Sequence, residues 1–193
     1  AHVDPEKDEI YVDGEKIVYS KYVYYMLNKP DGYVSATEDN LYPTVIDLIK
    51  EYHPGLFPVG RLDVDTEGLL LITNDGQLAH RLLSPRTHVP KTYYVKVKGR
   101  LGIGDINAFT KGIPLEDFTC MPAFLNIIKS DEISECEVTI YEGKFHQVKR
   151  MFQACGKEVV YLKRISMGEL KLDESLKLGH YRPLTDEEIN SIL

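Results

Sequence analysis

The sequence has few cysteines and lacks any long apolar run. Its three cysteines, Cys120, Cys136 and Cys155, are odd in number and widely spaced, and they form no Cys-x-x-Cys pair. They therefore predict neither a disulfide framework nor a zinc site, and we expect reduced thiols in a cytoplasmic protein. The longest apolar run, residues 68–72, is too short to cross a bilayer, and no signal-peptide pattern opens the chain. We therefore expect no membrane partner.

Acidic residues are scarce in two stretches of an otherwise acidic chain. The formal net charge of −7 by itself argues against a nucleic-acid partner. However, residues 76–100 hold six basic and no acidic side chains, and residues 143–171 hold seven basic and two acidic ones. If the fold brings these two basic segments together, they form a positive cleft that suits a phosphate backbone. If they stay apart, they are two ordinary solvated faces, and the charge pattern alone does not decide.

Strand and helix patterns alternate irregularly along the chain. Residues 9–19 alternate around Asp13-Gly14, which predicts a hairpin, and residues 28–32 and 55–60 have the composition of loops. The remaining predicted strands span residues 22–27, 69–73, 92–98, 123–129, 135–141 and 158–165. The predicted helices span residues 43–52, 77–83, 103–111 and 145–154, with a last short helix opened by a capping box at Thr185. This mixture, with its tight turns, predicts an α+β fold with a mostly antiparallel sheet.

The segment 60–68 is the most unusual part of the chain, because it holds one arginine and three carboxylates just before an apolar strand. In extended chain, Asp63 and Asp65 point the same way. Arg61 beside an aspartate would stabilise the ionised carboxylate that a nucleophile must be. From these residues alone, a structural role is the simpler interpretation: Asp65 caps a turn and Arg61 forms an ion pair.

Two further groups of residues lie in the basic segments. Tyr93 is in a predicted strand, where it could stack on a base or pack in the core. Lys149 and Arg150 are in a predicted helix and could pair with phosphates or carboxylates. His146, in the same segment, is on its own more typical of a hydrogen-bonded structural residue.

Five motifs occur in a fixed order. They are NKPDG (28–32), GRLDVDTEGLLLITNDG (60–76), KTYYVKV (91–97), EGKFHQVKRMF (142–152) and LKRISMG (162–168). Together they resemble the pseudouridine synthases that act on ribosomal RNA, in the branch that usually carries an N-terminal S4 domain. The resemblance implies a catalytic domain over residues 21–193, whose mixed sheet forms two subdomains that flank an active-site cleft. Residues 1–20 would then be the end of an S4-like domain and its linker.

The resemblance also assigns roles to single residues. It implies that Asp63 is the catalytic aspartate and Arg61 its motif partner, that Tyr93 stacks on the target uracil and that Leu162 lines the base pocket. It places Lys149 where many related synthases have an arginine paired with the aspartate, and a lysine offers a point charge in place of a fork. The residues that we expect on the RNA backbone are all basic: Lys29, Arg81, Arg86, Lys91, Arg150 and Arg164. No metal or cofactor is implied.

The predicted activity is therefore the isomerisation of a uridine in 16S ribosomal RNA to pseudouridine by a monomeric enzyme, with the uridine flipped into the cleft. Three alternatives remain open at this point. One is the same reaction on 23S RNA. Another is a non-catalytic module that binds ribosomal RNA, which would give Asp63 no role. The third is a carbohydrate hydrolase, which would need two essential carboxylates.

Overall fold

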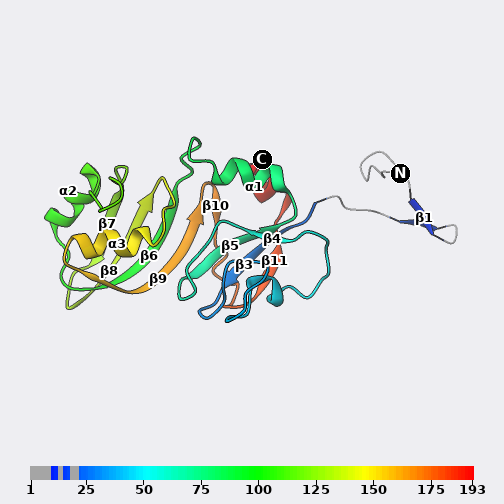
Figure 1. The fold of residues 1–193 in the computed structure, drawn as a ribbon, viewed down its shortest axis with the longest axis horizontal. Helices are drawn as coiled ribbons and strands as arrows, with labels where there is room; N and C mark the ends of the chain where they lie inside the picture. Colours follow the sequence, from blue (N-terminus) through cyan, green and yellow to red (C-terminus); the bar gives the residue numbers. More distant parts are fainter. Residues whose placement is uncertain (1–9, 13–14, 18–21) are drawn as a thin grey trace.

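The structure is a computed structural model that describes residues 10–12, 15–17 and 22–193 (Figure 1). Its strands are β1 (Ile10–Val12), β2 (Glu15–Ile17), β3 (Tyr24–Lys29), β4 (Phe57–Val59), β5 (Glu67–Thr73), β6 (Lys91–Lys98), β7 (Phe124–Lys129), β8 (Ile133–Ile140), β9 (Glu158–Met167), β10 (Leu170–Lys171) and β11 (Tyr181–Pro183). Its helices are the 3-10 helix η1 (Val45–Leu48) and the α-helices α1 (Gly76–Leu83), α2 (Ile103–Lys111), α3 (Gln147–Ala154) and α4 (Asp186–Ile192).

One nine-stranded sheet forms the body of the molecule. Its strand order is β11-β3-β5-β9-β6-β8-β7, with β4 attached to β5 and β10 attached to β9. Every pair of neighbours is antiparallel except β5 with β9. The α+β fold with a mostly antiparallel mixed sheet is therefore confirmed. Within the described residues, no helix is long and apolar enough to cross a membrane.

The parallel contact between β5 and β9 joins two halves of the sheet. It spans only two residue pairs, Glu67 with Lys163 and Gly68 with Arg164. Gly68 has a φ of +108°, and a Cβ placed on it would lie 2.2 Å from the carbonyl oxygen of Arg164. Only glycine combines this backbone conformation with such a close approach. The contact marks the boundary between two halves of the sheet. One half is built from β3, β5 and α1, and the other from β6, β8 and α3 (Figure 1), in agreement with the two predicted subdomains.

Strand β5 is buried on both faces, as its apolar run predicts. Leu70 and Ile72 belong to an apolar cluster that also contains Val95 of β6 and so spans both halves of the sheet. Leu69 and Leu71 point to the opposite face and pack in a second cluster with residues of α1 and α4. The strand that follows the 60–66 loop is therefore a fixed platform for that loop.

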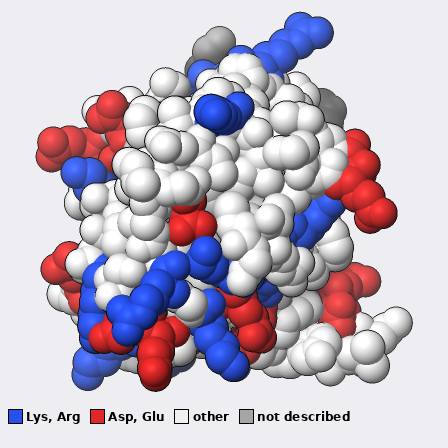
Figure 2. All heavy atoms as spheres, turned by 90° about the vertical axis from the view of Figure 1, so that its left-hand side faces the viewer, with Lys and Arg blue, Asp and Glu red and all other residues white. Residues whose placement is uncertain are grey.

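The two basic segments meet in the fold. Strand β6, from residues 76–100, pairs with β9, from residues 143–171, along its whole length from Lys91 to Lys98. The alternative in which these segments form two separate faces is therefore wrong. At the end of the molecule next to β7, by contrast, basic and acidic side chains are mixed over the surface (Figure 2).

Two predictions of secondary structure are wrong because backbone groups in these segments form hydrogen bonds with residues far along the chain. Residues 43–52 form only the short η1 and no α-helix, since the amide of Val45 donates to Val34 and that of Lys50 donates to the hydroxyl of Tyr181. Residues 57–59, expected in a loop, form β4 because they pair with β5. The predicted hairpin has both of its strands, β1 and β2, paired antiparallel. Its Asp13-Gly14 turn, and most of the proposed S4 remnant (1–20), lie outside the described residues.

Candidate active site

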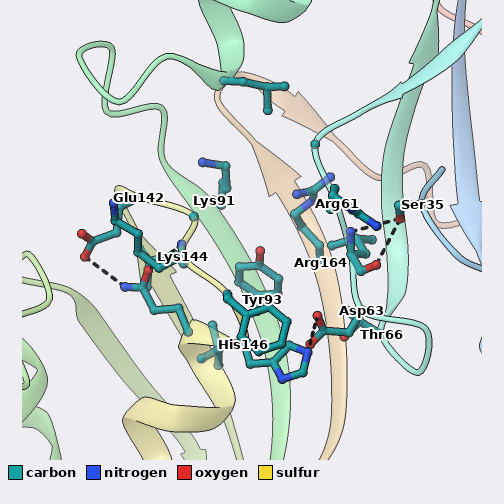
Figure 3. A pocket seen from close by; sticks show the side chains of 18 of the residues that line it. Ser35, Arg61, Asp63, Thr66, Lys91, Tyr93, Glu142, Lys144, His146 and Arg164 are labelled. Carbon is teal, nitrogen blue, oxygen red and sulfur yellow. Dashed lines mark hydrogen bonds and ion pairs between the residues drawn. The ribbon is translucent and has the colours of Figure 1, made fainter. Parts of the chain in front are cut away.

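A cleft with a volume of about 710 Å³ lies where the two halves of the sheet meet (Figure 3). Its walls come from the loop 60–66, from the segment 83–89 after α1, from β6 and β9, and from residues 140–149 at the start of α3. All five residues that the sequence assigned to catalysis or substrate binding line it: Arg61, Asp63, Tyr93, Lys149 and Leu162. The fold thus gathers into one cavity residues that are up to 101 positions apart, from Arg61 to Leu162.

The loop that carries Asp63 is fixed from below by Lys29. This lysine is fully buried, and its Nζ donates to the carbonyl oxygens of Pro30, Val64 and Thr66 at 3.1, 2.9 and 2.7 Å. Burial lowers the pKa of Lys29 to about 8, although nearby carboxylates oppose the shift. The prediction that Lys29 contacts the RNA backbone is therefore wrong, because its ammonium group has no access to the surface.

Ser35 adds a second tie to the same loop. Its hydroxyl donates to the carbonyl of Leu62 and accepts from the amide of Leu62, both at 3.1 Å. The amide of Thr66 also donates to the carbonyl of Asp63 at 3.0 Å, which closes a turn. The side chain of Asp63 therefore projects from a segment whose backbone is hydrogen-bonded both before and after this residue.

The carboxylate of Asp63 faces two nitrogen atoms from the opposite wall. Its Oδ1 lies 3.2 Å from Nε2 of His146, and its Oδ2 lies 3.2 Å from Nζ of Lys149. Lys149 also donates to Oδ1 of Asp65 at 2.7 Å, so it bridges the two aspartates. The side chain of Asp63 is 24% exposed and that of Asp65 is 65% exposed, so only Asp63 is largely enclosed.

Charges and hydrogen bonds in this cluster shift the pKa values of its members. Burial lowers the pKa of Lys149, but its contacts with Asp65 and Asp63 outweigh that effect, and the net shift is upward. Burial raises the pKa of Asp65, but the hydrogen bond and charge of Lys149 bring it below its usual range. Lys149 therefore stays protonated and able to donate over a wide pH range.

Arg61 is not the ion-pair partner of Asp63. Both residues line the cleft, but among the described residues the groups in ion-pair contact with Asp63 are His146 and Lys149. The expectation that the neighbouring arginine holds this carboxylate is therefore wrong. The cationic partner comes from α3, far along the chain, because the 60–66 loop turns Asp63 towards that wall (Figure 3).

Tyr93 and Leu162 form the floor between the two walls. They lie on the paired strands β6 and β9 and are only 8% and 6% exposed, respectively. In the view of Figure 3, the ring of Tyr93 lies between Lys91 and the contact of Asp63 with His146. An aromatic ring beside an apolar side chain suits a flat uracil-sized group.

Two of the basic residues predicted on the RNA backbone, Lys91 and Arg164, line the cleft. Arg164 is 2% exposed, and its Nε donates to the carbonyl of Leu69, whereas its buried Nη2 has no partner among the described residues. Burial and the charge of Arg164 lower the pKa of Lys91. Neither side chain forms an ion pair with a carboxylate in the described part of the chain, so this part of the cleft is suited to an anion.

The other predicted backbone contacts lie outside the cleft. Arg81 and Arg86 are exposed, on α1 and just after it. Arg150 forms an ion pair with Asp117 and donates to the carbonyl of Phe145. Their contact with RNA stays a prediction.

His146, which the sequence suggested only as a hydrogen-bonded structural residue, lies against Asp63, and this contact was not predicted. The available signal was its position three residues before Lys149, since both then lie at the start of one helix. No group of three or more histidine, cysteine, aspartate and glutamate side chains converges as metal ligands would, within the residues described.

The chain is similar in sequence and in structure to known proteins. The family described as RNA pseudouridylate synthase matches residues 23–154. An uncharacterised RNA pseudouridine synthase of Bacillus subtilis is 51% identical over 193 residues, covering 98% of this chain and 81% of the relative. Ribosomal small subunit pseudouridine synthase A of Escherichia coli is 44% identical over 194 residues, covering 98% and 82%.

A solved structure described as a pseudouridylate synthase has a TM-score of 0.82 and 42% sequence identity, and the match covers all of this chain and 83% of that one. The match therefore includes both halves of the sheet and the cleft between them. With a family match over most of the chain and relatives at 44% and 51% identity, this chain belongs to the RNA pseudouridine synthase family.

Proposed function

We propose that this enzyme converts a uridine of 16S ribosomal RNA to pseudouridine and that Asp63 is its reacting carboxylate. The observation that carries the proposal is the enclosed carboxylate of Asp63, which faces Lys149 above a floor of Tyr93 and Leu162. The RNA class is supported by the relatives named ribosomal small subunit pseudouridine synthase A, from Escherichia coli and from Salmonella typhimurium at 47% identity over 173 residues.

The reaction breaks the N1–C1′ bond of uridine, turns the uracil and joins its C5 to C1′; the proton on C5 is lost to solvent and the freed N1 takes one up. A paired or stacked base hides these atoms, so the uridine is flipped into the cleft at a cost of roughly a few kcal/mol. Tyr93 offers a ring face to the flipped uracil, and Leu162 offers an apolar surface on which it can turn. Because the cleft encloses the base, the detached uracil stays beside the sugar.

Asp63 acts as an ionised group, whether it attacks the sugar or the ring or takes a proton from the sugar. Lys149 gives that charge a partner at 3.2 Å. Lys91 provides a positive side chain for the phosphates of the flipped nucleotide, and the charge of the buried Arg164 adds to the positive field there, since neither is paired with a carboxylate in the described chain.

Membership of the synthase family decides against a carbohydrate hydrolase and against a non-catalytic module. The same reaction on 23S RNA remains an outcome of the test, because the two substrates place the same demands on the cleft.

The test measures tritium release from RNA labelled at uracil C5, using 16S RNA free and within small subunits, and 23S RNA in parallel. We expect release from a 16S form by the wild type and by Glu116→Gln, which alters an exposed carboxylate outside the cleft. Asp63→Asn should release none while it keeps the thermal stability of the wild type. Release from 23S RNA alone would overturn the substrate, and release by Asp63→Asn would overturn the role of Asp63.

A further inference from the structure

We propose that His146 is a positioning residue that orients the carboxylate of Asp63, an inference that rests on the proposed role of Asp63. The first observation is its backbone. His146 has a φ of +49°, and the only other described non-glycine residue with positive φ is His88. This left-handed conformation is strained for residues with a Cβ, and such strain persists where the surrounding structure enforces it.

Helix capping does not account for the strain. His146 is the N-cap residue of α3, yet its side chain makes no capping hydrogen bond. Its carbonyl accepts from the amide of Arg150 at 3.0 Å, which fixes the peptide to the first turn of the helix. The side chain is thereby directed away from the helix end and across the cleft, to Asp63 (Figure 3).

The imidazole ring of His146 stacks face to face on the ring of Phe145. The two rings are stacked, with centroids 3.7 Å apart and planes 18° apart. Phe145 itself is 76% exposed, so it covers the imidazole at the mouth of the cleft without being part of the core. Stacking limits rotation of the imidazole, and its Nε2 edge then lies 3.2 Å from Oδ1 of Asp63.

A second contact on Asp63 matters because the terminal torsion of an aspartate is broad. Lys149 holds only Oδ2, and it is shared with Asp65, which it approaches more closely. His146 holds the other oxygen, and among the described residues Asp63 is its single ion-pair contact. The two contacts together define the plane of the carboxylate, so the reacting oxygen has one direction in the cleft.

The contact requires a proton on Nε2 of His146, because a carboxylate only accepts. Both the neutral tautomer with that proton and the imidazolium provide it. A glutamine at this position places an amide N–H at a similar reach, whereas an alanine places nothing there. The pair His146→Ala and His146→Gln therefore separates loss of the donor from loss of the ring.

The experiment uses single-turnover tritium release on the RNA that the wild type modifies, together with RNA affinity and thermal unfolding. For His146→Ala we expect a rate about 10- to 100-fold lower, as for a reacting group displaced by up to 1 Å, with RNA affinity within about twofold and unchanged unfolding. His146→Gln should recover most of that rate. His80→Ala, at an exposed position of α1 outside the cleft, is the matched control and should behave as the wild type.

Three outcomes would overturn the inference. They are a wild-type rate for His146→Ala, equally low rates for the alanine and glutamine variants, and a loss confined to RNA affinity, which would make His146 an RNA contact. A wild type that modifies no ribosomal RNA would instead overturn the proposed function, and the inference would fall with it.

Discussion

Asp63 and its partners come from opposite walls of the cleft, and the two walls are held in different ways. The wall that carries Asp63 is tied by buried groups, since Lys29 and Ser35 bind its backbone and β5 is buried on both faces. The wall that carries His146 and Lys149 is a strained turn and the first residues of α3, and the His146 side chain is 40% exposed. The comparison indicates that buried contacts fix the backbone of Asp63, whereas its carboxylate is oriented by partners on the more exposed wall. Substitutions of the buried groups that hold the first wall should therefore act on folding, and those of His146 and Lys149 on the second wall should act on rate.

The largest effect is expected from Gly68→Ala, because it breaks the junction on which both walls depend. The new Cβ would lie 2.2 Å from the carbonyl oxygen of Arg164, and φ at this residue is +108°. We expect a loss of at least about 3 kcal/mol in the free energy of unfolding, measured by urea denaturation. Gly76→Ala, in α1 with open space around the new Cβ, should cost nothing or stabilise by about 0.5–1 kcal/mol. Equal stabilities of the two variants would contradict the close packing at the junction.

Lys29→Met tests the rigidity of the Asp63 wall. It leaves three carbonyl oxygens without their donor, and we expect a loss of about 3 kcal/mol in the free energy of unfolding at pH 7. Lys98→Met changes an exposed lysine of β6 and should stay within about 0.5 kcal/mol of the wild type. A loss of less than about 1 kcal/mol for Lys29→Met would mean that other contacts hold the loop.

Lys29 also predicts a dependence of stability on pH. Burial lowers its pKa to about 8 in the folded protein. The unfolded chain, in which a lysine has a pKa of about 10.4, therefore binds more protons between these two values, and stability from this group rises with pH across that window. Urea denaturation from pH 7 to 10.5 should show this rise in the wild type relative to Lys29→Met. A constant difference between the two proteins would contradict it.

Lys149→Met tests the wall that carries His146 and Lys149. The substitution removes the cation on Oδ2 of Asp63, and we expect about a 100-fold loss in the single-turnover rate with a small change in stability. Lys149→Arg should keep much of the activity, because it preserves the charge in a cluster that is open on one side. If Lys149→Met unfolded the protein instead of slowing it, the contrast between the walls would be wrong.

The smallest effect is expected from Asp65→Asn. Asp65 is 65% exposed, so its ion pair with Lys149 contributes little. In the variant, Asp63 is the one carboxylate of the described residues that still pairs with Lys149, and the rate should stay within about threefold of the wild type. The pKa of Asp65 lies below its usual range, so its stabilising contribution is present above a pH of about 4 and is lost as the pH falls through the folded pKa. Acid denaturation of Asp65→Asn should lack this small decline. A rate as low as that of Asp63→Asn would show that two carboxylates are essential.

The sequence by itself determined those elements whose signals are local. Helix α2 has the predicted ends, and the α4 capping box forms, with the amide of Glu188 donating to Thr185. Strand β6 buries alternate residues, as its pattern predicts. Each of these depends on the preferences of neighbouring residues, which are readable in order along the chain. The five motifs likewise indicated the family and the residues that line the cleft.

Only the tertiary structure decided which groups meet. Lys29 is buried and holds the loop that carries Asp63, because β3 continues through it, although its motif has the composition of a surface loop. Asp63 faces His146 and Lys149, more than 80 positions away, and not its neighbour Arg61, because a turn directs its side chain to the other wall. Such contacts depend on how the two halves of the sheet are joined at Gly68, and local patterns do not encode that geometry.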